Sequence, residues 1–312
     1  MNNILLIAIL AGLSVLTACS DDNGGNSPLT TVHLEGAIGL STRTVIGSDY
    51  EKDLDVCFAR QDATGATSET YGAWSVCKAV RNGGKGNRPV VFDKAQFYPS
   101  AGSNIRLHGY YPATGEGNAA TGRVVFTIDG MTDVMATGRL SGNSFSPLGT
   151  CTFRHLLTQL SLVCYSDRPD GWGEIARIEA TAVHTRQQLD WQSVSPVLSD
   201  ASSAEEIKAV AVQGISGLPI PRVEEGEELP EAQGYILLPV SPGPLELEVT
   251  TTKDGNGNVG EATCRISVRV EGDFLPGKRH VVSLFFTGGG QIRATSVGVE
   301  EWTDRDAGEI PI

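Results

Sequence analysis

The sequence has only one long apolar run, and that run is short for a membrane span. It extends from Ile4 to Leu16, whereas a transmembrane helix needs about 20 apolar residues. The next residues, L-T-A-C, have the form of a bacterial lipobox, although no Lys or Arg precedes the run. We therefore expect residues 1–18 to be a signal peptide and Cys19 to be the lipidated N-terminus of a lipoprotein. An ordinary signal peptide with a nearby cysteine is the alternative.

Basic residues are also scarce. The chain has 24 Lys and Arg against 37 Asp and Glu, which gives a net charge of −13. This acidity argues against nucleic acid or an anionic membrane surface as a partner, and it fits an extracytoplasmic protein. Residues 19–28 are polar and rich in Gly and Asn, so we expect them to form a flexible tether.

The sequence lacks the usual motifs of metal binding and catalysis. None of the six Cys forms a C-x-x-C pair or lies near a His at ligand spacing, which argues against zinc. Gly-x-Ser-x-Gly, Walker and His-Glu-x-x-His strings are missing, so we predict no enzyme, no metal and no cofactor. His155 begins an apolar strand and is expected to be structural. Cys57 and Cys77 lie in consecutive apolar runs and could form a disulfide, or remain buried free thiols.

The two-residue periodicity of β-strands, in contrast, runs through nearly the whole chain. Residues 245–251 (LELEVTT) and 264–270 (CRISVRV) alternate apolar with polar, and the D-G and G-N turn between them predicts a hairpin. Only residues 202–212 (SSAEEIKAVAV) have helical character. The same alternation and turn chemistry predict strands at 53–59, 74–80, 89–97, 105–111, 123–129, 157–165, 175–184, 207–212, 235–239 and 280–287.

This pattern predicts an all-β chain, for which β-sandwiches are the default architecture. A boundary near residues 139–149 divides the chain into an N-terminal domain, 29–146, and a C-terminal domain, 147–312. An acidic, Pro-rich stretch at 215–234 is expected to be a surface loop inside the second domain.

The stretch TVHLEGAIGLSTRTVI (31–46) combines a strand with an exposed basic residue. Val32, Leu34, Ile38 and Leu40 fall on one face of the expected strand, which then enters a loop of small residues that holds Arg43.

Several stretches, taken in order along the chain, resemble the fimbrillin family, the lipoprotein subunits of type V pili, in its minor-fimbrium branch. They are the lipobox and the early strand ending in TR, followed by FYPSAGSNIRLHGYYP, DVMATG, CTFRHLLTQLSLVCYS, FLPGKRHVVSLFFTG and IRATSVGVEEW. The resemblance implies two transthyretin-like β-sandwich domains in tandem. It also implies a palmitate-bearing precursor at the outer membrane and, after processing, a subunit of a cell-surface fimbrium that supports adhesion.

In this family an Arg-specific protease cuts after the first strand, and the best match here is the Arg43–Thr44 bond. Release of the four apolar side chains would forgo about 6–12 kcal/mol of burial. That amount rivals the stability of a whole domain, about 5–15 kcal/mol. A cut subunit should therefore take a strand from a neighbour, which is donor-strand exchange.

The C-terminal tail, 292–312, is the natural donor. Residues 292–299 could equally be the last strand of their own domain, and residues 303–312 an extension. Pro311 has no N–H and fits a central strand poorly. The candidate donor side chains are Ile292, Val297, Val299, Trp302, Ile310 and Ile312.

A lipid-retaining pilus anchor, or a surface lipoprotein that binds glycans and does not polymerise, is the alternative function. Trp74, Trp172, Trp191 and Trp302 could include a platform for a sugar, although core packing explains them more simply. The expected partners are other pilus subunits, the Arg-specific processing protease and the membrane through the lipid anchor of the precursor.

Overall fold

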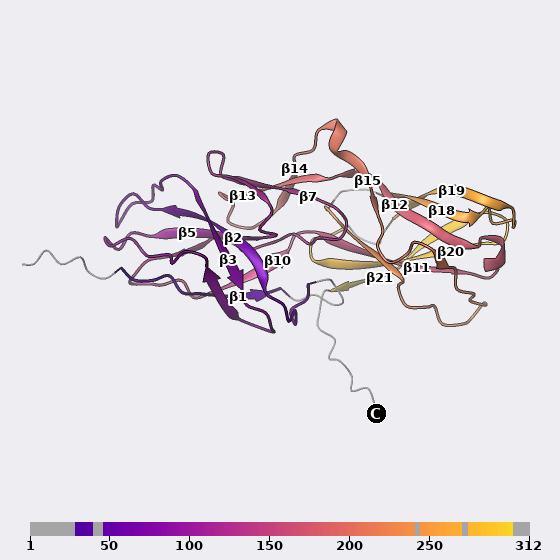
Figure 1. Cartoon of the computed structure of the whole chain (residues 1–312), viewed down its shortest axis with the longest axis horizontal. Helices are drawn as coiled ribbons and strands as arrows, with labels where there is room; N and C mark the ends of the chain where they lie inside the picture. Colours follow the sequence, from indigo (N-terminus) through magenta and orange to yellow (C-terminus); the bar gives the residue numbers. More distant parts are fainter. Residues whose placement is uncertain (1–28, 40–45, 241–243, 270–273, 302–312) are drawn as a thin grey trace, which may run out of the picture.

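The computed structural model describes residues 29–39, 46–240, 244–269 and 274–301, and over these ranges it is an all-β chain without an α-helix. The signal segment, Cys19, the tether and the Arg43–Thr44 pair lie outside the described residues. In the part of the chain that is described, no helix is long and apolar enough to cross a membrane. The molecule is elongated, with the N-terminal strands at one end and the C-terminal strands at the other (Figure 1).

The strands are short and mostly match the predicted ones. In the first half they are β1 (Leu34–Ile38), β2 (Leu54–Asp62), β3 (Ser75–Arg81), β4 (Arg88–Phe92), β5 (Ile105–Tyr111), β6 (Glu116–Asn118), β7 (Arg123–Thr127), β8 (Met135–Ala136) and β9 (Leu140–Gly142). They continue with β10 (Thr150–His155), β11 (Thr158–Ser166), β12 (Glu174–His184), β13 (Arg186–Asp190), β14 (Leu198–Asp200), β15 (Ile207–Ala211) and β16 (Leu218–Pro219). The last five are β17 (Gly234–Leu238), β18 (Leu245–Lys253), β19 (Val259–Val268), β20 (Lys278–Phe286) and β21 (Ile292–Glu301).

The N-terminal sheet closes on itself. Its strands are bonded in the order β2-β3-β4-β1-β10-β8-β5, and β5 pairs again with β2, while β9 adds to β5 from outside. Alternate side chains of these strands point into the ring, because successive residues of a strand face opposite sides. They form one buried apolar cluster that includes Leu34, Val56, Phe58, Leu107 and Phe153.

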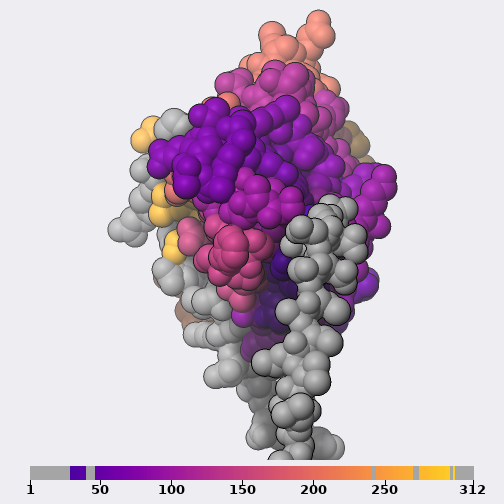
Figure 2. Space-filling model, turned by 90° about the vertical axis from the view of Figure 1, so that its left-hand side faces the viewer, coloured from indigo at the N-terminus to yellow at the C-terminus, as the bar shows by residue number. Residues whose placement is uncertain are grey.

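A second sheet, β6-β7-β13-β14, packs on the outside of this ring. The cluster between them includes Cys57, Tyr110, Phe126 and Trp191, and the rings of Tyr110 and Trp191 are stacked with centroids 6.1 Å apart. Seen end-on, the violet and magenta surface of these sheets faces the viewer, and the coral segment near residue 200 projects at the top (Figure 2).

The C-terminal strands form two sheets that face each other, β17-β11-β20-β21 and β15-β12-β18-β19, with a large apolar cluster between them. The predicted hairpin is confirmed as β18 and β19, with Glu248 opposite Arg265 and 3.2 Å between Arg265 Nε and Glu248 Oε2. The segment with helical character starts with one short 3-10 turn, Ala204–Glu206, and then becomes β15.

The predicted domain boundary at 146/147 remains a prediction, as does the transthyretin-like tandem. The hydrogen-bonded sheets cross this boundary, because β10 belongs to the N-terminal ring and β13 and β14 belong to the sheet that covers it. Three strands from beyond residue 147 therefore complete the N-terminal end of the molecule.

The possible disulfide between Cys57 and Cys77 is not formed, and both cysteines are free thiols. In the β2–β3 hairpin, Cys57 pairs with Lys78 and Phe58 pairs with Cys77. The two cysteines are therefore one residue out of register, and their side chains point to opposite faces of the sheet. The Cys77 thiol instead donates to Gln96 Oε1 at 3.3 Å.

Candidate functional site

The candidate site is the position of β1 inside the closed ring. β1 runs parallel to β10, with Ile38 opposite Phe153, and antiparallel to β4, with Leu34 opposite Val90. The backbone is bonded beyond both ends of the strand, since Val32 N donates to Gln96 O at 2.8 Å and Gly39 N donates to Phe153 O at 2.7 Å. The strand at the start of the described chain is thus a central one, with neighbours on both edges.

The apolar face of β1 is buried as predicted. Val32, Leu34 and Ile38 are each 4% exposed, while Leu40 lies outside the described residues. At about 1.5–3 kcal/mol for each buried side chain, these three contribute about 4.5–9 kcal/mol of apolar burial.

Arg81, at the end of β3, ties the β1 backbone to the interior of the ring. Its side chain is fully buried, and Nε donates to the carbonyl of Gly36 at 3.1 Å. Nη2 donates to the carbonyls of Gly84 and Gly86, each at 2.8 Å, in the β3–β4 turn. Among the described residues no carboxylate pairs with this guanidinium. Burial, and next the nearby Arg88, lower the pKa of Arg81.

Gly36 leaves the space that Arg81 and its neighbours occupy. A Cβ placed on Gly36 would lie 3.2 Å from Val90 Cγ2, 3.3 Å from Phe153 Cε2 and 3.4 Å from Arg81 Cγ. An alanine here would need its neighbours to shift by a few tenths of an ångström, and a larger side chain has no room. The packing around β1 therefore favours glycine at this position.

A buried pair of hydrogen-bonded side chains lies at the other end of β1. His155, the last residue of β10, binds Asp133 through Nδ1, and both side chains are almost completely buried. His155 Nε2 lies 3.4 Å from the carbonyl oxygen of Gly39. The structure agrees with the structural role predicted for His155 and adds that it contacts the end of β1.

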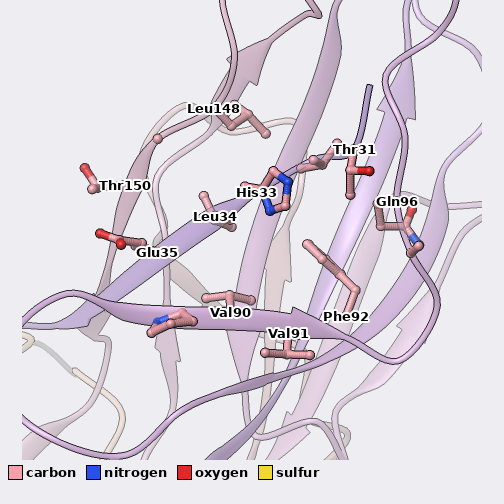
Figure 3. A pocket seen from close by; sticks show the side chains of 14 residues that line it. Thr31, His33, Leu34, Glu35, Val90, Val91, Phe92, Gln96, Leu148 and Thr150 are labelled. Atoms are coloured by element: carbon pink, nitrogen blue, oxygen red, sulfur yellow. The ribbon is translucent and has the colours of Figure 1, made fainter. Parts of the chain in front are cut away.

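A groove of about 600 Å3 lies at the start of β1, between β4 and the segment that precedes β10. Its walls come from β4, with Val90, Val91 and Phe92, and from the segment that precedes β10, with Leu148 (Figure 3). Val91 is 54% exposed, so part of this wall is apolar and open to solvent. The neighbourhood of β1 thus presents apolar surface even with the strand in place.

The candidate donor residues that the structure describes belong to a C-terminal sheet, apart from the ring that holds β1. β21 pairs antiparallel with β20 from Ile292 to Glu301 and forms an edge of its sheet. Ile292 packs partly buried against the C-terminal core. The backbone of Val297 and Val299 belongs to β21, whereas Trp302, Ile310 and Ile312 lie outside the described residues. Residues 292–301 are thus the last strand of their own sheet in this structure.

A second concave site, of about 370 Å3, lies where the ring meets its covering sheet. Trp74 and Trp191 line it at 5.5 Å between ring centroids, and Arg106 lies 3.5 Å from the ring centroid of Tyr71. Arg139 and Glu69 add charge of both signs.

Two buried nitrogens near this aromatic pocket make no hydrogen bond to the protein. They are Nε1 of Trp191, which lines the pocket, and Nε2 of His108, whose ring lies 6.0 Å from that of Trp74. Burial, aided by the charge of Arg139, lowers the pKa of His108 to about 4.

The described residues offer little for catalysis. No group of three metal-binding side chains occurs among them. Burial raises the pKa of Cys151 and of Cys164 to about 12, so neither thiol is a ready nucleophile. The arrangement around β1 can hold a strand, and the aromatic pocket can hold a small polar ligand.

Sequence reasoning missed Arg81, Gly36 and the partner strand β10 as parts of this site. One sequence feature could have indicated Arg81. In the stretch CKAVR, at the end of a predicted strand, Arg81 falls on the same face as Ala79, which is the buried face, so the alternation places this arginine inside the sheet.

No family model matches the sequence, and no curated protein matches it. Solved structures do resemble the chain. A "putative cell adhesion protein" from Bacteroides uniformis aligns with a TM-score of 0.58 and 14% identity, over 88% of this chain and 98% of that one. A second protein of that description, from Bacteroides ovatus, aligns with a TM-score of 0.54 and 14% identity, over 90% of this chain and all of that one.

A fimbrial protein from Bacteroides vulgatus aligns at a TM-score of 0.48 with 12% identity, over 88% of this chain and 99% of that one. The two alignments with TM-scores above 0.5 show that the chain shares its fold, over nearly its whole length, with proteins described as putative cell adhesion proteins. This likeness agrees with the fimbrillin resemblance of the sequence.

Proposed function

Because the chain has the fold of these cell adhesion proteins, we propose that it is a structural subunit of a cell-surface pilus. In this proposal the subunit is exported as a lipoprotein through Cys19 and cut between Arg43 and Thr44. Release of β1 opens the ring, and an extended segment from another subunit enters the place that β1 leaves. The observation that carries the proposal is the position of β1, a separable N-terminal strand that fills a central place in a closed sheet.

The physical support lies in what removal of β1 exposes. The facing edges of β4 and β10 would lose their ladder partners, and the apolar cluster would lose Val32, Leu34 and Ile38. Unpaired edges that flank an apolar groove favour the addition of a strand.

Two arginines further along the chain, Arg60 and Arg81, are poorly placed for a protease. Arg81 is fully buried. The Arg60 side chain is only 11% exposed, with Nε 2.7 Å from Asp62 Oδ1. Both belong to strands of the ring, so a cut there would remove further strands besides β1.

The experiment is to read the N-terminal residue of the protein from intact cell surfaces, beside its size on a mildly heated denaturing gel. We expect a start at Thr44 and a ladder of multimers. Arg43→Lys, which keeps the charge but removes the Arg that the protease reads, should leave the strand attached and the protein monomeric. A wild-type protein that keeps a lipidated Cys19 and stays monomeric would contradict the proposal and favour a lipid-retaining anchor.

The aromatic pocket supports a second candidate function, the binding of an acidic saccharide. Trp74 and Tyr71 offer aromatic surface, Arg106 and Arg139 offer cationic donors, and Trp191 Nε1 is a buried donor without a protein partner. Aromatic faces beside a few convergent polar groups are typical of small-ligand sites.

This function is tested by titrating the protein with trigalacturonate and with uncharged maltotriose, and following Trp fluorescence. The acidic sugar should bind, and Trp74→Ala and Arg139→Gln should each weaken binding at least tenfold. Arg265→Gln, an exposed arginine on β19, is the control. Equal binding of both sugars, or of neither, would contradict an acidic-saccharide site.

A further inference from the structure

We propose that Arg81 and the space at Gly36 fix the register of the strand that replaces β1, and that the segment Gly308–Ile312 of a second copy meets this requirement. The inference rests on the proposed strand exchange and names the partner and the alignment at that same site.

The first step is the state of Arg81 once β1 has left. Nη2 keeps its two carbonyl partners in the β3–β4 turn, whereas Nε loses the Gly36 carbonyl. A buried cationic donor without an acceptor is costly, so the ring favours a segment that places a carbonyl at this point. Every extended segment carries backbone carbonyls. The bond to Arg81 therefore fixes how the incoming strand is aligned along the groove, and it depends little on the side chains of that strand.

The second step is the lack of space around that carbonyl. Val90 Cγ2, Phe153 Cε2 and Arg81 Cγ lie within 3.2–3.4 Å of where a Cβ would stand. Only glycine fits without displacing these atoms. The ring therefore favours an incoming strand that brings a glycine to Arg81, with a large apolar residue two positions further along the same face, where Ile38 is buried.

The third step is that β1 and the C-terminal tail share this pattern. Residues 36–40 read GAIGL and residues 308–312 read GEIPI. Aligned on glycine, Ile310 takes the place of the buried Ile38, and Ile312 takes the place of Leu40. Glu309 takes the place of Ala37, which is half-buried on the outward side.

The alternative glycine of the tail lacks an apolar residue two positions further along. Gly298 in ATSVGVEE would bring Ser296 and Glu300 to the places of Leu34 and Ile38, so polar groups would enter the apolar core. Gly308 brings two acidic residues inward, Asp304 at the place of Val32 and Asp306 at the place of Leu34, but it keeps an isoleucine at the place of Ile38. Pro311 takes the place of Gly39, forfeits the bond from Gly39 N to Phe153 O and brings a Cβ to a point 3.2 Å from that oxygen.

The test uses the full mature chain with a recognition sequence for a second, unrelated protease placed within residues 41–45, so that the cut does not depend on the natural enzyme. After the cut, a labelled peptide of residues 302–312 is titrated and its fluorescence anisotropy is read. Multimers are scored separately on a mildly heated gel.

We expect the wild-type peptide to bind and Gly308→Val to weaken it at least tenfold. Glu309→Val, which adds an equal side chain one residue away on the outward side, is the matched control and should bind nearly as well as wild type. Pro311→Ala should bind more tightly, because it restores an N–H. In the protein, Arg81→Met should weaken the wild-type peptide at least tenfold, and the exposed neighbour Arg88→Met should not.

The outcomes separate the register from the function. Multimers together with equal binding of the wild-type and Gly308→Val peptides would overturn the register and leave polymerisation standing. Peptide binding with the expected pattern but no multimers would support the register and contradict the polymerising subunit. No binding of the wild-type peptide, or equal losses for Gly308→Val and Glu309→Val, would overturn the register.

Discussion

The first and the last described strands occupy different kinds of position in their sheets. At the N-terminal end, β1 lies between β4 and β10 and completes a closed ring. At the C-terminal end, β21 is bonded to β20 alone and forms a sheet edge. Without β1 the N-terminal ring could not close, whereas β21 only extends the edge of a C-terminal sheet. Loss of a strand should have unequal consequences in the two regions.

The largest expected effect comes from deleting each terminal strand in turn. A chain without residues 29–39 loses about 4.5–9 kcal/mol of apolar burial, besides two ladders of hydrogen bonds. A chain without residues 292–301 loses one ladder and the partly buried Ile292 and Ala294. Hydrogen exchange should rise sharply in β4 and β10 after the first deletion, and only in β20 after the second. Equal protection loss in both regions would refute the contrast.

The buried pair of His155 and Asp133 is expected to contribute the next largest difference. His155→Leu leaves the Asp133 carboxylate buried without its partner, which should cost about 3–5 kcal/mol in the free energy of unfolding. His184→Leu is the matched control, because its pair with Asp200 is half exposed and should be worth less than about 1 kcal/mol. Urea unfolding of the two variants measures the difference. Similar midpoints would show that His155 does not hold the ring.

Both regions hold a buried histidine that should make stability fall in acid. Burial lowers the pKa of His108 to about 4 and also lowers the pKa of His280. Because the unfolded chain binds the proton near pH 6.5, stability is present above that pH and is lost as pH falls toward 4. His108 alone accounts for a loss of about 3 kcal/mol. His108→Gln should flatten the dependence between pH 6.5 and 4, and an unchanged slope would contradict the assignment.

The smallest effect is expected for the exposed pair on the β18–β19 hairpin. Arg265, whose side chain is 79% exposed, contacts Glu248 at 3.2 Å. Arg265→Gln should change the free energy of unfolding by less than about 1 kcal/mol, and even less at high salt. A thermal scan at two salt concentrations checks this. A larger loss would mean that the C-terminal edge depends on charge more than its geometry indicates.

The alternation of apolar and polar residues predicted most strands correctly, because these strands bury one face and expose the other. The strand at 105–111 has both ends as predicted, and the hairpin predicted from residues 245–251 and 264–270 formed. The parallel pairing of β1 with β10 joins residues more than a hundred positions apart, and no local pattern encodes it. Of the two alternatives for Cys57 and Cys77, the structure has the free thiols. The sequence could not decide between them, because it does not give the register of the two strands, and a shift of one residue reverses the face.

Arg81 shows why the site itself was harder to predict than the strands. Its charge indicates solvent exposure in a sequence, since Arg is rarely fully buried. In the fold its donors reach carbonyls of the β3–β4 turn and of β1, which only the closed ring brings together. In the sequence, Gly36 is only a residue with low strand propensity. Its role in packing becomes visible when the fold places Val90 and Phe153 beside it.

The pairing of β1 with β10 also sets an order of events during synthesis and export. The first strand of the ring to leave the ribosome or a translocation channel cannot find its parallel partner until residue 155 has followed. Contacts between such distant residues carry a large loop-closure cost and form late. The hairpins β2–β3 and β3–β4, in contrast, join near neighbours. The chain should therefore pass through a stage in which these hairpins exist and the first strand is still outside, so an open ring would be a state that every molecule visits while it folds.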